Sequence, residues 1–202
     1  MQFEELMDFK EFNNYFVMGL SRPKNNKSVG KKDRVFYRYP VNSADSYRET
    51  LERMEADCVR TGLKMYVYVS VNSRDTTKAF EHFNILKAKY EAEARRGKPA
   101  NLNKLYTKMD KVWYGVCMKP HARGSKYFLV DIDNKTPELR EKIAKILSTN
   151  GYEVLVEKET RNGFHWITKP FDVRLLSGIP DVGVQKDGLL YITCTGFEDM
   201  NQ

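Results

Sequence analysis

The chain has 202 residues, of which 41% are hydrophobic and 12% aromatic, so it is long and apolar enough to bury a core of its own. This composition excludes a disordered chain, although 30% of the residues are charged. No stretch approaches the roughly 20 apolar residues that cross a bilayer, and the acidic N-terminal segment is unlike a secretory signal. The 34 lysines and arginines outnumber the 27 aspartates and glutamates, and the net charge of +7 permits a polyanionic partner.

The three cysteines, Cys58, Cys117 and Cys194, have neither the spacing of a zinc site nor the even number of a disulfide framework. Scattered cysteines in odd number are typical of a reducing compartment, so we expect a cytoplasmic protein without a membrane segment. We also expect a single domain over residues 1–202, with a helical and basic N-terminal part over 1–62 and a core over 64–194 that holds the chemical motifs.

The N-terminal part begins with hydrophobic residues at mostly helical spacing, which predict a helix over residues 3–20. Residues 21–34 carry six basic side chains and little to bury, so they predict a basic loop. Residues 34–39 are rich in β-forming types and predict a strand, which Pro40 closes.

The remaining elements follow from caps, glycines and alternating apolar residues, and together they predict an α+β fold with a central, mostly antiparallel or mixed sheet flanked by helices. In order they are a helix between Ser43 and Gly62, a strand over 64–71, a helix over 75–97, a helix over 101–116, a strand over 126–133, a helix from Thr136 to Gly151, strands over 152–158 and 163–169, and a closing hairpin of 182–185 and 189–194 around residues 186–188.

Two aspartates stand at the end of the apolar strand Phe-Leu-Val-Asp-Ile-Asp. Because strand side chains alternate between faces, Asp131 and Asp133 point the same way. Two adjacent carboxylates repel each other unless a hard cation such as Mg²⁺ or Mn²⁺ lies between them. A polar strand end that begins a turn explains the same residues equally well.

A histidine follows the flexible segment Thr-Arg-Asn-Gly on another strand. His165 lies on the face opposite Phe164 and Trp166, where it can donate to a phosphate oxygen, and Gly163 permits close backbone approach. The alternative is a structural histidine, and that reading is preferred for His82 and His121.

Two further segments add polar residues at strand ends. Asp181 opens a strand after a proline and suits either a metal ligand or a turn. Arg74, in the segment Val-Asn-Ser-Arg, can grip a phosphate through its planar fork or pair with a surface acid. Asp187, in a Lys-Asp-Gly turn, is expected at a solvent-facing hairpin tip.

The order of these segments resembles that of the archaeo-eukaryotic primase superfamily, the primase-polymerases, over residues 64–194. FLVDID is similar to their first motif, TRNGFH to the second and PDVGV to the third. The resemblance implies that Asp131, Asp133 and Asp181 are catalytic ligands of two Mg²⁺ or Mn²⁺ ions. It implies that His165 binds the incoming nucleotide. The other nucleotide-binding residues it suggests are Arg74, Thr160, Asn162, Gly163 and Lys186.

Such an enzyme would extend nucleic acid on a single-stranded DNA or RNA template with nucleoside triphosphates, and a helicase or other replication protein would be supplied separately. Template contacts are expected from the basic residues Lys24, Lys27, Lys31, Lys32, Arg34 and Arg38. Tyr37 and Tyr39 interleave with these arginines and suit either base stacking or core packing.

Two alternatives remain. The first is a protein of the same fold that binds nucleic acid or a nucleotide without polymerising it. The second is a two-histidine phosphoesterase, which would need two strands of the form His-x-Ser/Thr. Around His165 the hydroxyl residue, Thr168, comes one position too late, and the chain holds no second copy.

Overall fold

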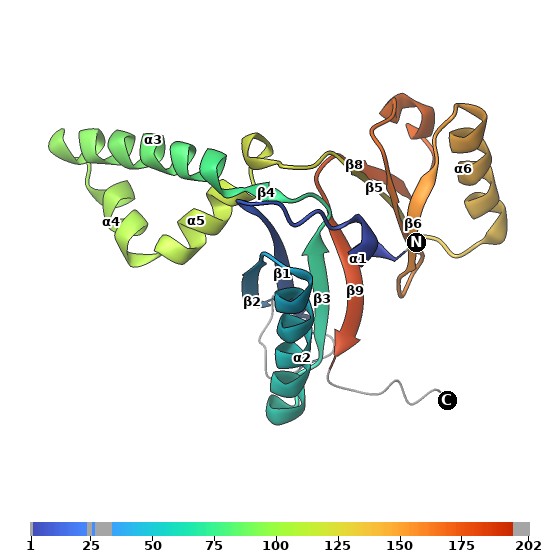
Figure 1. The fold of residues 1–202 in the computed structure, drawn as a ribbon, viewed down its shortest axis with the longest axis horizontal. Coiled ribbons are helices and arrows are strands. Elements are labelled where there is room, and N and C mark those ends of the chain that lie inside the picture. Colours follow the sequence, from blue (N-terminus) through green and yellow to red (C-terminus); the bar gives the residue numbers. More distant parts are fainter. Residues whose placement is uncertain (1, 24–25, 27–33, 196–202) are drawn as a thin grey trace.

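Two antiparallel sheets form the framework of the computed structural model, which describes residues 2–23, 26 and 34–195 (Figure 1). The strands are β1 (Asn13–Ser21), β2 (Arg34–Val41), β3 (Met65–Ser70), β4 (Arg74–Asp75), β5 (Phe128–Ile132), β6 (Val154–Glu159), β7 (Phe164–Thr168), β8 (Val182–Gln185) and β9 (Leu189–Thr195). The first sheet has the order β2-β1-β3-β9, with β4 paired to β1, and the second has the order β6-β7-β5-β8. The expected α+β class is confirmed, with two sheets in place of one central sheet.

Some of the helices lie against these sheets and others project away from them (Figure 1). They are α1 (Phe3–Leu6), α2 (Ala44–Thr61), α3 (Thr76–Arg95), α4 (Ala100–Thr107), α5 (Met109–Cys117) and α6 (Pro137–Thr149), with the short 3₁₀ turns η2 (Pro120–Ala122) and η3 (Val173–Leu176). Within the described ranges, no helix is both long enough and apolar enough to cross a membrane.

The predicted opening helix over 3–20 is wrong beyond its first turn, because residues 13–21 form β1 in the middle of the first sheet. Apolar residues occupy both faces of β1, so their spacing fits a helix as well as a strand. Pairing with β2 on one side and β3 on the other decides the outcome.

Helix α2 begins and ends where the sequence predicts. Ser43 accepts the backbone N–H of Ser46, and the Ser46 hydroxyl accepts that of Ser43, which completes a capping box. Gly62 ends the helix at a φ of 65°. The helix buries Tyr47 and Met54 against the first sheet, so only the opposite face of that sheet remains for a site.

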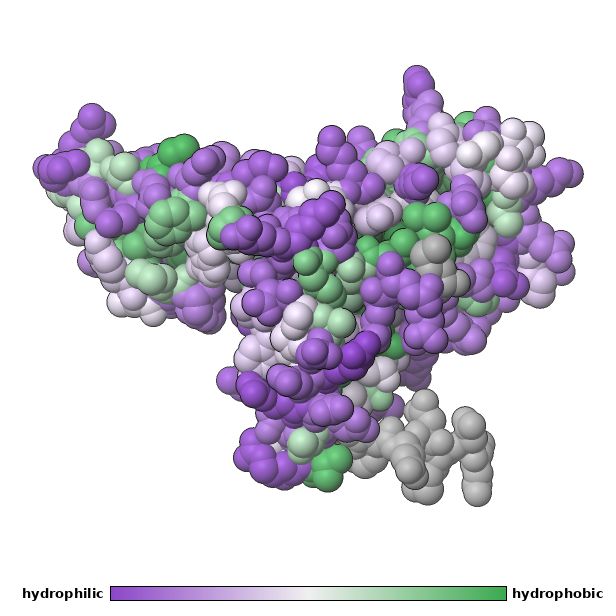
Figure 2. Space-filling view, viewed as in Figure 1, coloured by the Kyte–Doolittle hydropathy of each residue, from purple (hydrophilic) through white to green (hydrophobic). Residues whose placement is uncertain are grey.

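Helices α3, α4 and α5 form an arm that projects from the first sheet (Figure 1). The single helix predicted over 101–116 is wrong, because the backbone at Lys108 leaves the helical region and separates α4 from α5. Figure 2 shows hydrophobic areas on this arm amid mostly hydrophilic side chains, and Phe80 and Tyr106 are exposed there.

The arm meets η2 through two histidines. The rings of His82 and His121 are stacked with centroids 3.3 Å apart. Burial, with neighbouring His82 and Lys119, lowers the pKa of His121 below its usual value. The unfolded chain therefore binds a proton here at a higher pH than the folded chain does.

Acidification should thus weaken the fold through His121. As the pH falls from about 7.5 to about 5.5, the melting temperature of the wild type should fall more steeply than that of His121→Asn. Thermal denaturation of both proteins across this range measures the difference. Parallel pH profiles would show that His121 has an ordinary pKa.

The second sheet follows the chain order β5-α6-β6-β7-η3-β8, a split β-α-β arrangement. Phe128, Val130 and Ile132 of β5 lie in the core beneath α6, together with Trp166 of β7. The alternate residues of β5 therefore face the first sheet.

The predicted closing hairpin is wrong, because β8 pairs with β5 while β9 pairs with β3. Residues 186–188 connect the two sheets, and Asp187 is only 16% exposed instead of lying at a solvent-facing tip. The Arg74 side chain, which is completely buried, donates to both Asp187 oxygens at 2.6 and 2.8 Å. This pair fixes the connection between the sheets.

Removing Arg74 should therefore destabilise the protein. Arg74→Ala leaves the Asp187 carboxylate partly buried without its main partner, which should lower the free energy of unfolding by about 3–5 kcal/mol. Chemical denaturation measures this loss. Arg174→Ala is the matched control, since Arg174 also pairs with an aspartate, Asp172, but is 86% exposed and should change stability little. Equal effects would contradict the structural role of the buried pair.

Candidate functional site

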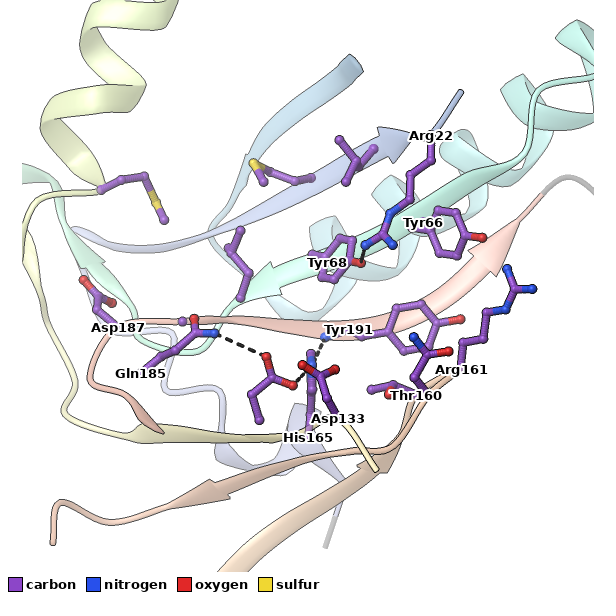
Figure 3. A pocket seen from close by; sticks show the side chains of 17 residues that line it. Arg22, Tyr66, Tyr68, Asp133, Thr160, Arg161, His165, Gln185, Asp187 and Tyr191 are labelled. Carbon is purple, nitrogen blue, oxygen red and sulfur yellow. Dashed lines mark hydrogen bonds and ion pairs between the residues drawn. The ribbon is translucent and has the colours of Figure 1, made fainter. Parts of the chain in front are cut away.

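A cleft of about 530 Å³ lies between the two sheets. Figure 3 shows Arg22, Tyr66 and Tyr68 on the wall formed by the first sheet, and Asp133, Thr160 and His165 on the opposite side. The described residues that line it are Met18, Leu20, Arg22, Tyr66, Tyr68, Met118, Asp131, Asp133, Thr160, Arg161, Asn162, His165, Gln185, Asp187, Gly188, Leu189 and Tyr191.

Three of the residues predicted from the motifs meet in this cleft. Phe128, Val130 and Ile132, which alternate with the two aspartates, pack in the core under α6. Asp131 and Asp133 therefore point to the other side, into the cleft. His165 lies directly across from Asp131 in the pairing of β5 with β7. The alternation of both strands thus places two carboxylates and an imidazole in one hollow, as the sequence predicts.

His165 is oriented by contacts at both ring nitrogens. The backbone N–H of Tyr191 donates to its Nδ1 at 3.1 Å, so the other nitrogen, Nε2, carries the proton. Nε2 faces Asp131 Oδ1 at 3.3 Å, and the Gln185 side chain donates to the other Asp131 oxygen at 3.5 Å. The ring therefore presents a donor to the cleft.

Sequence reasoning missed Tyr191 and Gln185 because their positions depend on the register of β9 against β3 and of β8 against β5. Neither register has a local signal. Gln185 does face the same side as Leu129, its partner on β5, and this could have been found once that pairing was known.

The opposite wall combines an arginine with tyrosines. The Arg22 guanidinium donates to the Tyr68 hydroxyl at 3.2 Å and lies 5.0 Å from the centre of the Tyr66 ring. Burial raises the pKa of Tyr68, while Arg22 opposes that effect. Arg161 adds a second cation to the lining (Figure 3). The cleft thus pairs carboxylates with cations and aromatic rings, an arrangement suited to a cation-bound phosphate ester with an attached base.

The segment between β6 and β7 forms a tight turn at the cleft. The Thr160 N–H donates to the Gly163 carbonyl at 2.9 Å, and the Thr160 hydroxyl accepts the Gly163 N–H at 3.1 Å. Thr160 and Asn162, which the motif resemblance assigns to nucleotide binding, line the cleft. A Cβ on Gly163 would overlap the Ile132 carbonyl, so this glycine permits the turn to pack against β5.

Asp181 differs from the other two aspartates. It is exposed and is absent from the described residues that line the cleft, and its carboxylate accepts from the Asn134 amide at 3.1 Å. Its φ of 61° interrupts the extended backbone just before β8. The alternation of side chains between the two faces of β8 therefore does not predict where the Asp181 side chain points. In residues 2–23, 26 and 34–195, no three His, Cys, Asp or Glu side chains are grouped to hold a metal ion.

The structure also leaves Arg74 and Lys186 outside the cleft lining in the described part of the chain. Arg74 is engaged by Asp187, which lines the cleft in its place. Lys186 is exposed, and its carbonyl accepts from Arg123 at 2.8 Å.

Two of the six basic residues expected at a template lie in the described part of the chain. Arg34 and Arg38 are on β2 and do not line this cleft. Lys24, Lys27, Lys31 and Lys32 lie outside the described residues.

No family model, curated protein or solved structure matches this chain. The interpretation of the cleft therefore depends on the residues that line it.

The packing of the Thr160–Gly163 turn can be tested by adding one methyl group. Gly163→Ala should lower the free energy of unfolding by about 3 kcal/mol, the upper end of the usual cost of overpacking. Gly115→Ala is the control, because its Cβ would meet no atom within 4 Å. That helix substitution should instead stabilise the protein by roughly 0.5–1 kcal/mol. Urea denaturation compares the two, and an unaffected Gly163→Ala would show that the turn packs differently.

Proposed function

We propose that the chain is a primase-polymerase core, a nucleotidyltransferase that adds nucleotides to nucleic acid on a single-stranded template. The observation that carries this proposal is the meeting of Asp131, Asp133 and His165 from two paired strands in a cleft with Arg22 and Arg161. The motif order in the sequence supports the same conclusion.

The acidic pair fits hard divalent cations. Asp131 on β5 and Asp133 directly after it both line the cleft with carboxylate oxygens, and Mg²⁺ and Mn²⁺ favour such ligands. When bound, these ions would supply positive charge for the attacking hydroxyl and the phosphate oxygens. Asp187 lines the same cleft, but Arg74 and Arg123 offset its charge.

The remaining residues suit the nucleotide. The Nε2–H of His165, which faces Asp131, can donate to a phosphate oxygen, since Tyr191 keeps the ring in place. Arg22 and Arg161 would offset the charge of the triphosphate. The Tyr66 and Tyr68 rings offer apolar surface to the base or sugar.

One observation favours the alternative of a nucleotide-binding protein that does not polymerise. The Asp181 carbonyl accepts the Asp133 N–H at 2.8 Å, but the Asp181 carboxylate accepts from Asn134 and does not line the cleft, so the cleft lining holds two of the three expected carboxylates. Arg22, His165 and the tyrosines would still bind a nucleotide in that case, and only the transfer step would be lost.

Asp131→Asn tests the transfer step. The amide is nearly isosteric with the carboxylate, so folding and template binding should persist while incorporation of labelled nucleotide falls by about 10²–10³-fold. His165→Ala should act on the nucleotide, with a higher KM or a lower turnover and unchanged affinity for single strands. Asp172→Asn is the control and should leave activity unchanged, because Asp172 pairs with Arg174 and is not among the residues that line the cleft.

The measurement compares incorporation with Mg²⁺ or Mn²⁺ and strand binding on all four proteins. A wild type that incorporates nothing with either metal but binds nucleoside triphosphate would support the non-polymerising alternative. Full activity of Asp131→Asn would show that this cleft is not the active site.

A further inference from the structure

A second pocket, of about 320 Å³, lies between β2 and α5. Its lining includes Phe16, Phe36, Arg38, Asp110, Trp113 and Tyr114. These residues come from three separate parts of the chain that β2, β1 and α5 bring together. None of them lines the cleft that holds Asp131 and His165.

The pocket is built from rings and cations. The Arg38 guanidinium lies 5.2 Å from the centre of the Tyr114 ring, and the Arg34 guanidinium lies 5.1 Å from that of Phe36. Arg38 Nε is buried, with no hydrogen-bond partner among the described residues. Phe36 is 36% exposed, because a bulge opposite Gly19 and Leu20 leaves it without a partner on β1. The exposed Phe36 ring and the Arg38 guanidinium, whose Nε has no hydrogen-bond partner in the described residues, suit a flat ligand that carries a negative charge nearby.

The pocket is joined to the cleft by one row of side chains across the first sheet. Tyr191 of β9 pairs with Tyr68 of β3, which pairs with Met18 of β1, and Met18 pairs with Arg38 of β2. Residues paired in this way share a face of the sheet. The Tyr114 hydroxyl contacts the Met18 sulfur at 2.8 Å, so the two hollows adjoin at Met18.

We infer that this row is a track for single-stranded nucleic acid, and that the pocket between β2 and α5 holds one unstacked base of that strand. Three strand spacings separate β9 from β2, or about 14 Å. That distance accommodates about four nucleotides at the rise of a helical strand, and fewer when the strand is extended. The inference deepens the proposed function, on which it rests in treating this strand as the template.

The chemistry of the pocket favours a single strand over other occupants. Bases stack on aromatic side chains whatever their sequence, and arginines contact the backbone phosphates. A duplex hides the faces of its bases. Asp110 would repel an acidic peptide, whereas it can accept a hydrogen bond from the amino group of a base.

Trp113 makes this inference directly measurable. The chain has two tryptophans, and Trp166 is 1% exposed in the core under α6. In a Trp166→Phe background, a short oligodeoxythymidine without nucleotide or metal should quench the Trp113 fluorescence saturably. Phe36→Ala and Arg38→Ala should each weaken that binding by about five- to 150-fold. Arg53→Ala is the matched control, because Arg53 also lies over a tyrosine of β2 but does not line the pocket.

Each outcome decides between occupants. Equal quenching by a duplex of the same sequence, or by polyglutamate, would overturn the assignment to a single strand. Unchanged affinity for the strand in Phe36→Ala and Arg38→Ala would show that the pocket between β2 and α5 does not hold a base. Anisotropy of a labelled strand on otherwise wild-type protein repeats the comparison if Trp166→Phe does not fold.

The same measurements separate this inference from the proposed function. Quenching of Trp113 without any nucleotide incorporation would support the single-strand track and contradict the polymerase function. Nucleotide incorporation without Trp113 quenching, and without an effect of Arg38→Ala, would support the polymerase and contradict the track.

Discussion

The buried pair between Arg74 and Asp187 sets the position of one sheet relative to the other. Arg74 follows the central strand β3 of the first sheet, and Asp187 lies where the chain passes from β8 to β9. Beside this pair, the Asn72 amide donates to the Tyr127 carbonyl and accepts the Tyr127 N–H just before β5. Two parallel N–H···O bonds allow little rotation or sliding. Because the cleft lies between the sheets, its width depends on these contacts.

The same pair also shapes the electrostatics of the cleft. Burying a guanidinium and a carboxylate is costly, and an apolar pair could give similar stability. We therefore interpret the role of the pair as fixing the position of one sheet relative to the other. With Asp187 offset by Arg74 and Arg123, the carboxylates of the cleft lining that have no arginine partner are Asp131 and Asp133. A cation would therefore be drawn to the end of β5.

Local sequence signals predict only part of this arrangement. The Ser43 cap, the Gly62 stop and the alternation along β5 depend on neighbouring residues, and the structure agrees with them. The pairing of β8 and β9 with strands of different sheets depends on partners fifty or more residues away, and no local pattern encodes it. Asp131, Asp133 and His165 were predictable as residues that line the cleft, because Asp131 and His165 lie inside regular strands and Asp133 directly follows β5. Asp181 was not, since its backbone leaves the strand conformation.

A single bulge in β9 affects both the orientation of His165 in the cleft and the row of side chains across the first sheet. Thr193 pairs with Val67 and Tyr191 pairs with Tyr68, so Ile192 is an extra residue between them. Without it, Ile192 would lie opposite Tyr68, and the side chain of Tyr191 would turn to the other face of the sheet. The backbone N–H of Tyr191 that now donates to His165 would shift as well. The orientation of the imidazole and the row of side chains across the sheet therefore depend on the same inserted residue. A shift in the pairing of β9 would disrupt both together.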